Sequence, residues 1–228
     1  MTTIGILGTG RMGVRLARAF ARNGSQVVIG SRTPERARRI AADLQLPGVR
    51  GGSYAEAADA PLLLPALFLR DGLLDLLEPL RPRLDGKLYV DISNPFNADY
   101  SDFILPWDTS AAEEIQRRFP RTRVVGAFKN VWWEVFDAPE FDAGLASDVY
   151  VVADDEPAKQ ALLRLVKGLP FRFLDAGRLS NARVVERMTL FSGELGQRAG
   201  FFPRMNWRLL GEPWNAGRKD DLAPLLVR

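Results

Sequence analysis

The stretch Ile4-Gly5-Ile6-Leu7-Gly8-Thr9-Gly10-Arg11-Met12-Gly13 decides the fold of this chain. A strand-like apolar run leads directly into the pattern G-x-G-x-x-G, and an amphipathic helical pattern follows without a break. In this context Gly8 allows a tight turn, Gly10 lets the backbone approach a pyrophosphate, and Gly13 lets the helix pack closely on the strand. The stretch therefore predicts a dinucleotide-binding unit, with a purely structural glycine-rich turn as the alternative. Arg11 is predicted either to reach a phosphate or to be a solvated surface residue.

The end of the second predicted strand distinguishes NADP from NAD. In an NAD-specific site an acid at this position bonds to the ribose 2′-hydroxyl and would repel a 2′-phosphate. Residues 30–33 contain no Asp or Glu; Ser31 and Arg32 stand there, and Arg36 follows one helical turn later. A hydroxyl and two guanidinium groups match the charge and geometry of a phosphate. We therefore predict NADP(H) as the cofactor. The alternative is that Ser31 and Arg32 only form a turn and a helix cap.

Strand-like runs alternate with amphipathic helical patterns along most of the chain, which is typical of βαβ units and a parallel sheet. The predicted strands are 3–7, 26–30, 61–66, 87–92, 123–128, 148–153 and 171–175. The predicted helices are 12–22, 34–44, 70–80, 110–118, 156–168 and 180–197. The fold class is therefore α/β, a doubly wound, mostly parallel sheet of the Rossmann NAD(P)-binding type. We expect residues 1–200 to form the NADP-binding domain and residues 201–228 to form a tail that packs on the body or on a second subunit.

Composition excludes several kinds of chemistry. The 228 residues include no cysteine and no histidine, so disulfides, thiol chemistry, His/Cys zinc sites and Ser-His-Asp sites are excluded, and we predict no metal. The net charge of +3 comes from arginines scattered along the chain and not from a basic block, so no nucleic-acid partner is predicted.

No membrane or secretory segment is predicted. The longest strongly apolar stretch, residues 60–69, contains two prolines and is far shorter than the roughly twenty residues of a membrane helix. The first residues enter a strand pattern directly, without the basic and apolar regions of a secretory signal, and this favours a cytoplasmic protein.

Three blocks of residues carry a resemblance to a known family. They are Gly8-Thr9-Gly10-Arg11-Met12-Gly13, Val28-Ile29-Gly30-Ser31-Arg32 and Asp175-Ala176-Gly177-Arg178-Leu179-Ser180-Asn181-Ala182-Arg183-Val184-Val185-Glu186. Through them, residues 1–195 resemble the NADPH-dependent deazaflavin (factor 420) reductases, also called factor-420-dependent NADP oxidoreductases. The same residues resemble the related oxidoreductase domain of six-transmembrane metalloreductases. The third block discriminates most, because generic Rossmann proteins do not carry it.

The resemblance implies a set of cofactor contacts. In the glycine turn and the 2′-phosphate corner they are Gly8, Thr9, Gly10, Arg11, Met12, Gly13, Ser31, Arg32 and Arg36. At the ends of the predicted strands 61–66, 87–92 and 123–128 they are Pro65, Ala66, Leu67, Ser93, Asn94, Ala127, Phe128 and Asn130. Several deazaflavin reductases have a histidine followed by Thr-Ile-Pro where this chain has Lys129 followed by Asn130-Val131-Trp132. The Ala127-Phe128 pair is closer to the metalloreductase branch, whose acceptor is a flavin.

The resemblance implies hydride transfer between NADPH and a deazaflavin, or FAD or FMN, as the second substrate. Stacked rings at about 3–3.5 Å need no acid or base from the protein, so no catalytic residue is assigned. Lys129 is a weak candidate for one, and a structural or substrate-binding role is favoured for it. An aromatic group follows two strand ends and suits a planar acceptor, with ordinary core packing as the alternative. Its members are Phe96, Tyr100, Phe103, Trp107, Trp132 and Trp133.

The predicted partners are a small-molecule redox acceptor and a second copy of the chain. The helix 180–197 carries Val184, Val185, Met188 and Phe191 at helical spacing, which favours a packing face and a homodimer. Three other functions remain open: a flavin or ferric reductase, a small imine or carbonyl reductase, and a non-enzymatic NADP-sensing module. In the sensing module a partner would dock at Trp207 and Trp214.

Overall fold

The computed structural model describes residues 2–213 of the chain. Its centre is a six-stranded parallel sheet of order β3-β2-β1-β4-β5-β6. The strands are β1 (Thr3–Leu7), β2 (Gln26–Ser31), β3 (Val49–Ser53), β4 (Leu62–Pro65), β5 (Leu88–Asp91) and β6 (Arg123–Gly126). The order reverses between β1 and β4, and open α/β sheets of this kind hold their ligands at the carboxyl ends of the strands beside such a switch. The predicted doubly wound fold is confirmed.

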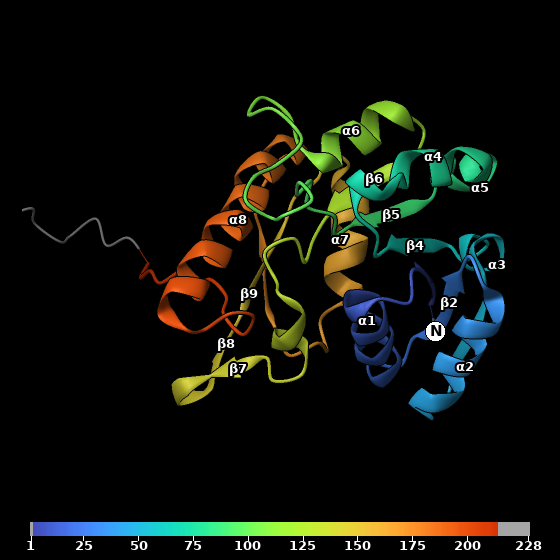
Figure 1. The fold of residues 1–228 in the computed structure, drawn as a ribbon, viewed down its shortest axis with the longest axis horizontal. Helices are drawn as coiled ribbons and strands as arrows, with labels where there is room; N and C mark the ends of the chain where they lie inside the picture. The colour runs from blue at the N-terminus through green and yellow to red at the C-terminus, as the bar shows by residue number, and fades with distance from the viewer. Residues whose placement is uncertain (1, 214–228) are drawn as a thin grey trace, which may run out of the picture.

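Helices cover both faces of this sheet (Figure 1). They are α1 (Arg11–Arg22), α2 (Pro34–Leu44), α3 (Tyr54–Ala58), α4 (Leu73–Leu77), α5 (Arg81–Leu84), α6 (Ala111–Arg118), α7 (Glu156–Leu165) and α8 (Ala182–Ala199). Buried side chains of α1, α2 and α7 share one apolar core with Ile4 and Ile6 of β1. Those of α3 to α6 and the start of α8 share a second core with Leu7. Strand β1 is therefore buried on both faces, as parallel strands usually are.

A smaller strand pair extends the sheet beyond β6. The parallel strands β9 (Asp148–Val151) and β10 (Arg172–Asp175) are connected by α7. They join the main sheet through an antiparallel bridge, in which Gly126 and Val152 exchange N–H···O bonds of 2.8 and 3.0 Å. A short hairpin of β7 (Glu140–Phe141) and β8 (Leu145–Ala146) precedes β9. Figure 1 shows α8 at the opposite side of the molecule from α2.

Short 3₁₀ turns complete the elements: η1 (Leu69–Asp71), η2 (Glu78–Leu80), η3 (Trp133–Phe136), η4 (Asp142–Gly144) and η5 (Leu179–Asn181). The single helix predicted over 70–80 is wrong, because this segment is divided into η1, α4 and η2. Gly72 has a φ of +82° and ends η1, and Pro79 lies within η2. A proline removes a helical N–H donor and crowds the preceding turn, so a continuous helix does not form.

Strand β3 and helix α3 are absent from the predicted elements. Gly51 and Gly52 occupy the middle of β3, so the strand lacks the apolar alternation that would reveal it. Glycine is needed where α3 and α2 approach the sheet closely: a Cβ on Gly5 would lie 1.9 Å from the Ala57 oxygen, and one on Gly51 would lie 2.2 Å from the Ala37 carbon. Close packing of α3 brings Tyr54, its first residue, to the carboxyl end of β2.

The described part of the tail, residues 201–213, lies against the body. Met205 is buried, and the indole N–H of Trp207 donates to the Met188 oxygen of α8 at 3.0 Å. The side chain of Asn206 accepts from the Asn130 amide at 2.9 Å. Trp214 lies outside the described residues. Within residues 2–213, no helix is both long enough and apolar enough to cross a bilayer.

Candidate functional site

The glycine turn between β1 and α1 has the geometry that the sequence predicts. Gly8 has a φ of +115°, and its N–H donates to the Gly30 oxygen at 2.9 Å. A Cβ on Gly13 would lie 2.3 Å from the Gly8 oxygen, so only glycine lets α1 approach this closely. A Cβ on Gly10 would meet nothing within 4 Å. The backbone of Gly10 therefore faces open space, where a ligand has room to approach.

The N-terminus of α1 has no side-chain cap. The same holds for α2, α4, α5 and α8, whereas Ser53, Ser110 and Asp155 cap α3, α6 and α7. The first N–H groups of a helix lack helical acceptors, and together with the helix dipole they favour an anion. This uncapped end fits the pyrophosphate of a dinucleotide. Arg11 is exposed in the first turn of α1, and its guanidinium lies 4.9 Å from the centre of the Trp133 ring. Thr9 and Met12 are half-buried beside the turn.

Positive charge collects at the carboxyl end of β2. The Ser31 hydroxyl accepts from the Thr33 N–H at 3.1 Å and fixes the turn, while Arg32 and Arg36 are exposed. Neither arginine forms an ion pair with a carboxylate within residues 2–213. No sequence pattern indicates Tyr54, whose hydroxyl lies within the electrostatic influence of Arg32. Burial raises the pKa of the Tyr54 hydroxyl, and Arg32 partly opposes this, so Tyr54 stays neutral near pH 7. This corner fits a 2′-phosphate.

The end of β4 lies directly beside the glycine turn. Pro65 is in register with Leu7, and the Ala66 N–H donates to the Leu7 oxygen at 2.7 Å. A Cβ on Gly8 would lie 2.8 Å from the Ala66 oxygen and 3.2 Å from Leu67. The structure thus brings residues 65–67 together with the turn that is predicted to bind the phosphates.

The end of β5 presents an unsatisfied polar atom. The Ser93 N–H and hydroxyl both donate to Asp91, at 3.0 and 2.5 Å, and this holds the chain as it leaves the strand. The Asn94 amide N–H donates to the Lys129 backbone oxygen at 2.8 Å. The Asn94 Oδ1 atom is buried without any hydrogen-bond partner. Such an orphan costs about 1–3 kcal/mol, so Oδ1 fits a donor supplied by a ligand, such as a ribose hydroxyl or carboxamide.

Lys129 is fully enclosed in a network that uses all three of its N–H donors. Its Nζ atom contacts Asp91 and also bonds to the Ser93 oxygen at 2.6 Å and to Glu186 at 2.7 Å. Burial by itself would lower the pKa of Lys129, but the two carboxylates outweigh it and the pKa is raised. Lys129 therefore stays protonated and holds strand ends together, which is the structural role favoured for it.

Glu186 connects this network to two helices. It lies on α8 and accepts from the Ala111 N–H at the start of α6, at 3.1 Å. Burial raises the pKa of Glu186 above its ordinary value, and the Lys129 charge opposes this. Glu186 is the last residue of the most discriminating sequence block, but its position in the centre of the molecule depends on tertiary contacts that the block does not show.

The turn after β6 keeps its side chains inside the protein. Phe128 has a φ of +56° and is surrounded by other rings, with centroids at 5.6–6.3 Å. The Asn130 amide donates to the Asp148 oxygen at 2.7 Å, and Ala127 is completely buried. Because these side chains pack inside the protein, only the backbone of the turn is available to contact a cofactor.

Five of the six predicted acceptor aromatics form one continuous group. Phe96 contacts Tyr100, Phe103 and Trp132, and Trp132 contacts Trp133, with ring centroids 5.2–6.0 Å apart. Trp107 is apart from this group, 78% exposed and covered by the Arg187 guanidinium. Phe202, from the tail, joins the group at 5.0 Å from Trp132. The sequence gives no signal for Phe202, because nothing in the tail indicates where it packs.

Arg70 contacts the loop that follows β5 and carries Phe96 and Tyr100, and the sequence did not predict this contact. Its guanidinium lies over the rings of Phe68 and Tyr100, at 4.4 and 4.3 Å, and donates to the backbone oxygen of Asn97. The loop that carries Phe96 and Tyr100 is therefore fastened to the end of β4.

Two kinds of known protein are similar to this chain in sequence. Residues 3–95 match the model of the family described as NADP oxidoreductase, coenzyme F420-dependent. The F420-dependent NADP reductase of Methanocaldococcus jannaschii is 30% identical over 199 residues, which cover 80% of this chain and 86% of that protein. The metalloreductase STEAP3 of Rattus norvegicus is 30% identical over 188 residues, which cover 82% of this chain but 36% of that protein.

A solved structure agrees with the first kind. It comes from Arthrobacter sp. FB24 and is provisionally assigned as an F420-dependent NADP reductase. The two structures superpose with a TM-score of 0.79 at 27% sequence identity, covering 88% of this chain and 96% of the other. The fold is thus shared along nearly the whole length of that protein.

Proposed function

The chain belongs to the family of coenzyme F420-dependent NADP oxidoreductases, and from this premise we propose that it transfers hydride between NADPH and the deazaflavin ring of F420. It is an NADP-dependent oxidoreductase by family. The observation that carries the proposal is the uncapped N-terminus of α1 beside an acid-free arginine corner, in a chain that is 30% identical to an F420-dependent NADP reductase.

Each part of the site has a distinct task in this proposal. The N–H groups of α1 and Arg11 bind the pyrophosphate, and Ser31, Arg32 and Arg36 bind the 2′-phosphate. The Asn94 carbonyl orients the nicotinamide half by accepting one hydrogen bond. NADPH, when bound, supplies a hydride from C4 of its nicotinamide, and this transfer requires positioning at about 3–3.5 Å.

The chain's own residues also exclude water from the hydride path, and the proton that the acceptor ring takes up in addition to the hydride comes from solvent. The outer members of the aromatic group, Tyr100, Phe103, Trp133 and Phe202, are exposed or half-buried and provide an apolar wall for a planar acceptor, while Phe96 and Trp132 pack in the core behind them. Lys129 has no free N–H or lone pair, so it neither donates nor accepts a proton. Hydride transfer to a ring needs neither.

A flavin acceptor is the second candidate. The observation that favours it is the 30% identity to the metalloreductases, over 82% of this chain. This chain spans only about a third of the length of those proteins, since 36% of STEAP3 is covered. FAD or FMN would stack against the same aromatic wall.

The test is NADPH oxidation by the purified chain, followed at 340 nm with four acceptors in parallel. The acceptors are coenzyme F420, FMN, FAD with a ferric chelate, and a cyclic imine. We expect rapid turnover with F420 alone. Turnover only with FAD or FMN would assign the chain to the flavin branch, and turnover only with the imine would replace the proposal. Tight NADPH binding without turnover would favour an NADP-sensing module.

The proposal includes a homodimer in the cytoplasm. Val184, Phe191 and Leu195 are 61%, 53% and 43% exposed along one side of α8. Phe191 and Leu195 follow Val184 by seven and eleven residues, so the three side chains form one stripe along the helix. Exposed apolar stripes of this kind mark interfaces. A second copy of the chain is the occupant that we assign to this stripe.

A further inference from the structure

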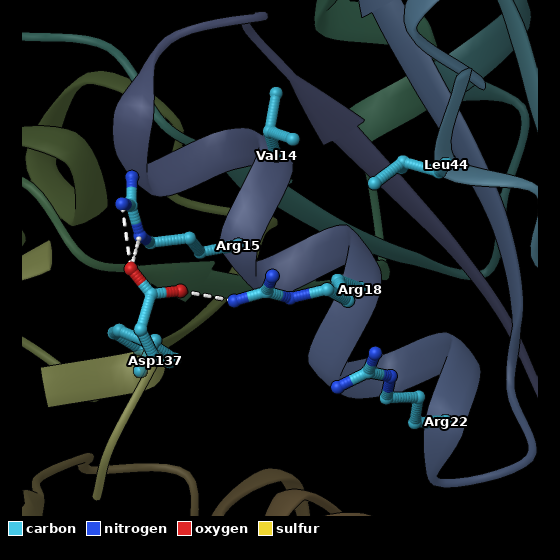
Figure 2. Close-up of a pocket in the computed structure, with 7 residues that line it drawn as sticks. Val14, Arg15, Arg18, Arg22, Leu44 and Asp137 are labelled. Carbon is cyan, nitrogen blue, oxygen red and sulfur yellow. Dashed lines mark hydrogen bonds and ion pairs between the residues drawn. The ribbon is translucent and has the colours of Figure 1, made fainter. Parts of the chain in front are cut away.

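A cleft lies along α1, from Val14, the residue after Gly13, to Arg22 (Figure 2). Its volume is about 460 Å³, and its lining residues are Val14, Arg15, Arg18, Arg22, Leu44, Phe136 and Asp137. A smaller hollow of about 150 Å³ shares the three arginines and Phe136 and continues toward Pro170. Neither the sheet edge nor the aromatic wall contributes to this cleft.

The cleft has more positive than negative charge. Asp137 bridges two arginines: its Oδ2 atom accepts from the Arg15 Nε at 2.7 Å, and its Oδ1 atom pairs with Arg18. Arg22 forms no ion pair with any carboxylate in the described part of the chain. Three guanidinium groups and one carboxylate give the lining a net charge of +2. The like charges of Arg15, Arg18 and Arg22 repel one another along α1, and no acidic residue in the first turn of α1 offsets them.

This cleft is separate from the dinucleotide site. The phosphates are expected at the N-terminus of α1, while Arg15, Arg18 and Arg22 lie one to three turns further along the helix. At 1.5 Å per residue, Arg22 is about 16 Å from Arg11 along the axis. The apolar part of the lining comes from Phe136 of η3, Leu44 of α2 and Val14 of α1.

We propose that the cleft binds a small polyanion, with at least two phosphate or carboxylate groups, and that Asp137 occupies the place of one group when the ligand is absent. The two oxygens of Asp137 contact one arginine each, as a ligand carboxylate or phosphate would. Asp137 is 37% exposed and directly follows η3, so it can be displaced. Arg22 is left to bind the second group. A volume of about 460 Å³ is typical of small-molecule sites.

Displacement of Asp137 also acts on the oxidoreductase site. Asp137 fastens η3 to α1, and η3 begins with Trp133, whose ring lies against Arg11 at the glycine turn. A polyanion in the cleft therefore changes the surroundings of Trp133. Binding is expected to change tryptophan fluorescence.

Calorimetric titration of the full chain, saturated with NADP⁺, tests the proposal. Saturation occupies the dinucleotide site, so further binding of a polyanion reports on the cleft. Pyrophosphate and citrate serve as probes in separate arms, and the arm that binds distinguishes a phosphate ligand from a carboxylate ligand. We expect one site per chain. Failure of both probes to bind would overturn the proposal.

Three variants locate the binding. Arg22→Ala removes a guanidinium that has no ion-pair partner in the described part of the protein. We expect it to weaken binding about tenfold, because one exposed charge-assisted hydrogen bond to the ligand is lost. Asp137→Asn removes the competing carboxylate and is expected to tighten binding. Arg39→Ala, an exposed arginine of α2 outside the cleft, is the control and should change nothing. Equal weakening by Arg22→Ala and Arg39→Ala, or no tightening by Asp137→Asn, would contradict the proposal.

Discussion

At the scale of single residues, the preference for NADP(H) depends on a small polar corner at the end of β2. Ser31 fixes the turn, Arg32 is placed beside Tyr54, and Arg36 faces solvent. Burial raises the pKa of Tyr54, so this neutral hydroxyl can hold the Arg32 guanidinium without neutralising it. Arg32 therefore keeps its full charge for a phosphate.

Replacing Arg32 should change the choice of cofactor. We expect Arg32→Ala to raise the KM for NADPH about tenfold or more and to leave the KM for NADH nearly unchanged, because only NADPH carries the 2′-phosphate. Steady-state kinetics with both dinucleotides measure this ratio. Arg38→Ala, which removes an arginine paired with Glu35 on the same helix, is the matched control. An unchanged preference in the Arg32 variant would rule out the proposed corner.

The buried Lys129 network should contribute mainly to stability. Lys129→Met leaves Asp91 and Glu186 buried without their cation, and breaking such a pair costs about 3–5 kcal/mol. Urea unfolding measures the loss. Arg198→Met removes an exposed pair with Glu194 and should cost less than about 1 kcal/mol. Full stability of Lys129→Met with complete loss of hydride transfer would instead give Lys129 a role in the chemistry.

At the scale of elements, the N-terminus of α7 depends on one carboxylate. Asp155 accepts from the Ala158 N–H at 2.9 Å and from Arg123 of β6 at 2.7 and 3.0 Å. The Arg123 hydrogen bonds lower the pKa of Asp155 below its ordinary value. The ionised form thus stabilises the fold above the unfolded pKa of about 3.9, and this contribution is lost as pH falls through the lower, folded pKa.

The variant Asp155→Asn tests this dependence while keeping a capping side chain. The pair is partly exposed, at 38% and 33%, so solvent screens it and the expected loss at pH 7 is about 0.5–1 kcal/mol. The difference from the wild type should shrink as the pH falls below about 4. Chemical unfolding from pH 3 to 7 measures both. A difference that is constant over this range would refute the assigned charge interaction.

Helix α8 depends on glycine where it contacts the aromatic group. A Cβ on Gly193 would lie 2.9 Å from the Trp132 ring, whereas one on Gly196 would lie 2.7 Å from the flexible end of Met205. Alanine favours a helix over glycine by about 1 kcal/mol. We nevertheless expect Gly193→Ala to lower the melting temperature and shift tryptophan fluorescence, because the rigid ring must move. Gly196→Ala should be tolerated better. Equal or higher stability of Gly193→Ala would contradict this packing.

Some elements of the structure are predictable from the sequence alone, and others are not. The alternation of apolar strands and helices predicts the parallel sheet, and the glycine turn fixes where it begins. Strand β3 and Tyr54 are missed because Gly51 and Gly52 hide the strand pattern. The Lys129 network is missed as a unit because its members are 38 and 57 residues apart in sequence and meet only through tertiary packing. Trp107 makes no ring contact with the aromatic group and stays exposed, and Arg187 lies over both its ring and that of Phe103.

At the scale of the whole molecule, the chain places its nucleotide half and its long helix on opposite sides. Figure 1 shows α2 and α8 at the two ends of the long axis. The apolar stripe of α8 is thus available to a second copy without covering the end of β2. We expect light scattering to give twice the chain mass, and Val184→Asp to give a monomer, since Val184 is 61% exposed. Val184→Ala, which stays apolar, should remain dimeric. A monomeric wild type would contradict the homodimer.

The most direct measurement of the central claim is the fate of deuterium placed at the transferable C4 position of NADPH. We expect one deuterium on carbon in each reduced F420 molecule. Hydride passes directly between two positioned rings, and the carbon–hydrogen bond that forms does not exchange with water. Mass spectrometry of the reduced acceptor shows this. Reduced F420 without deuterium, with the label left in NADPH or released to solvent, would contradict direct transfer by this chain.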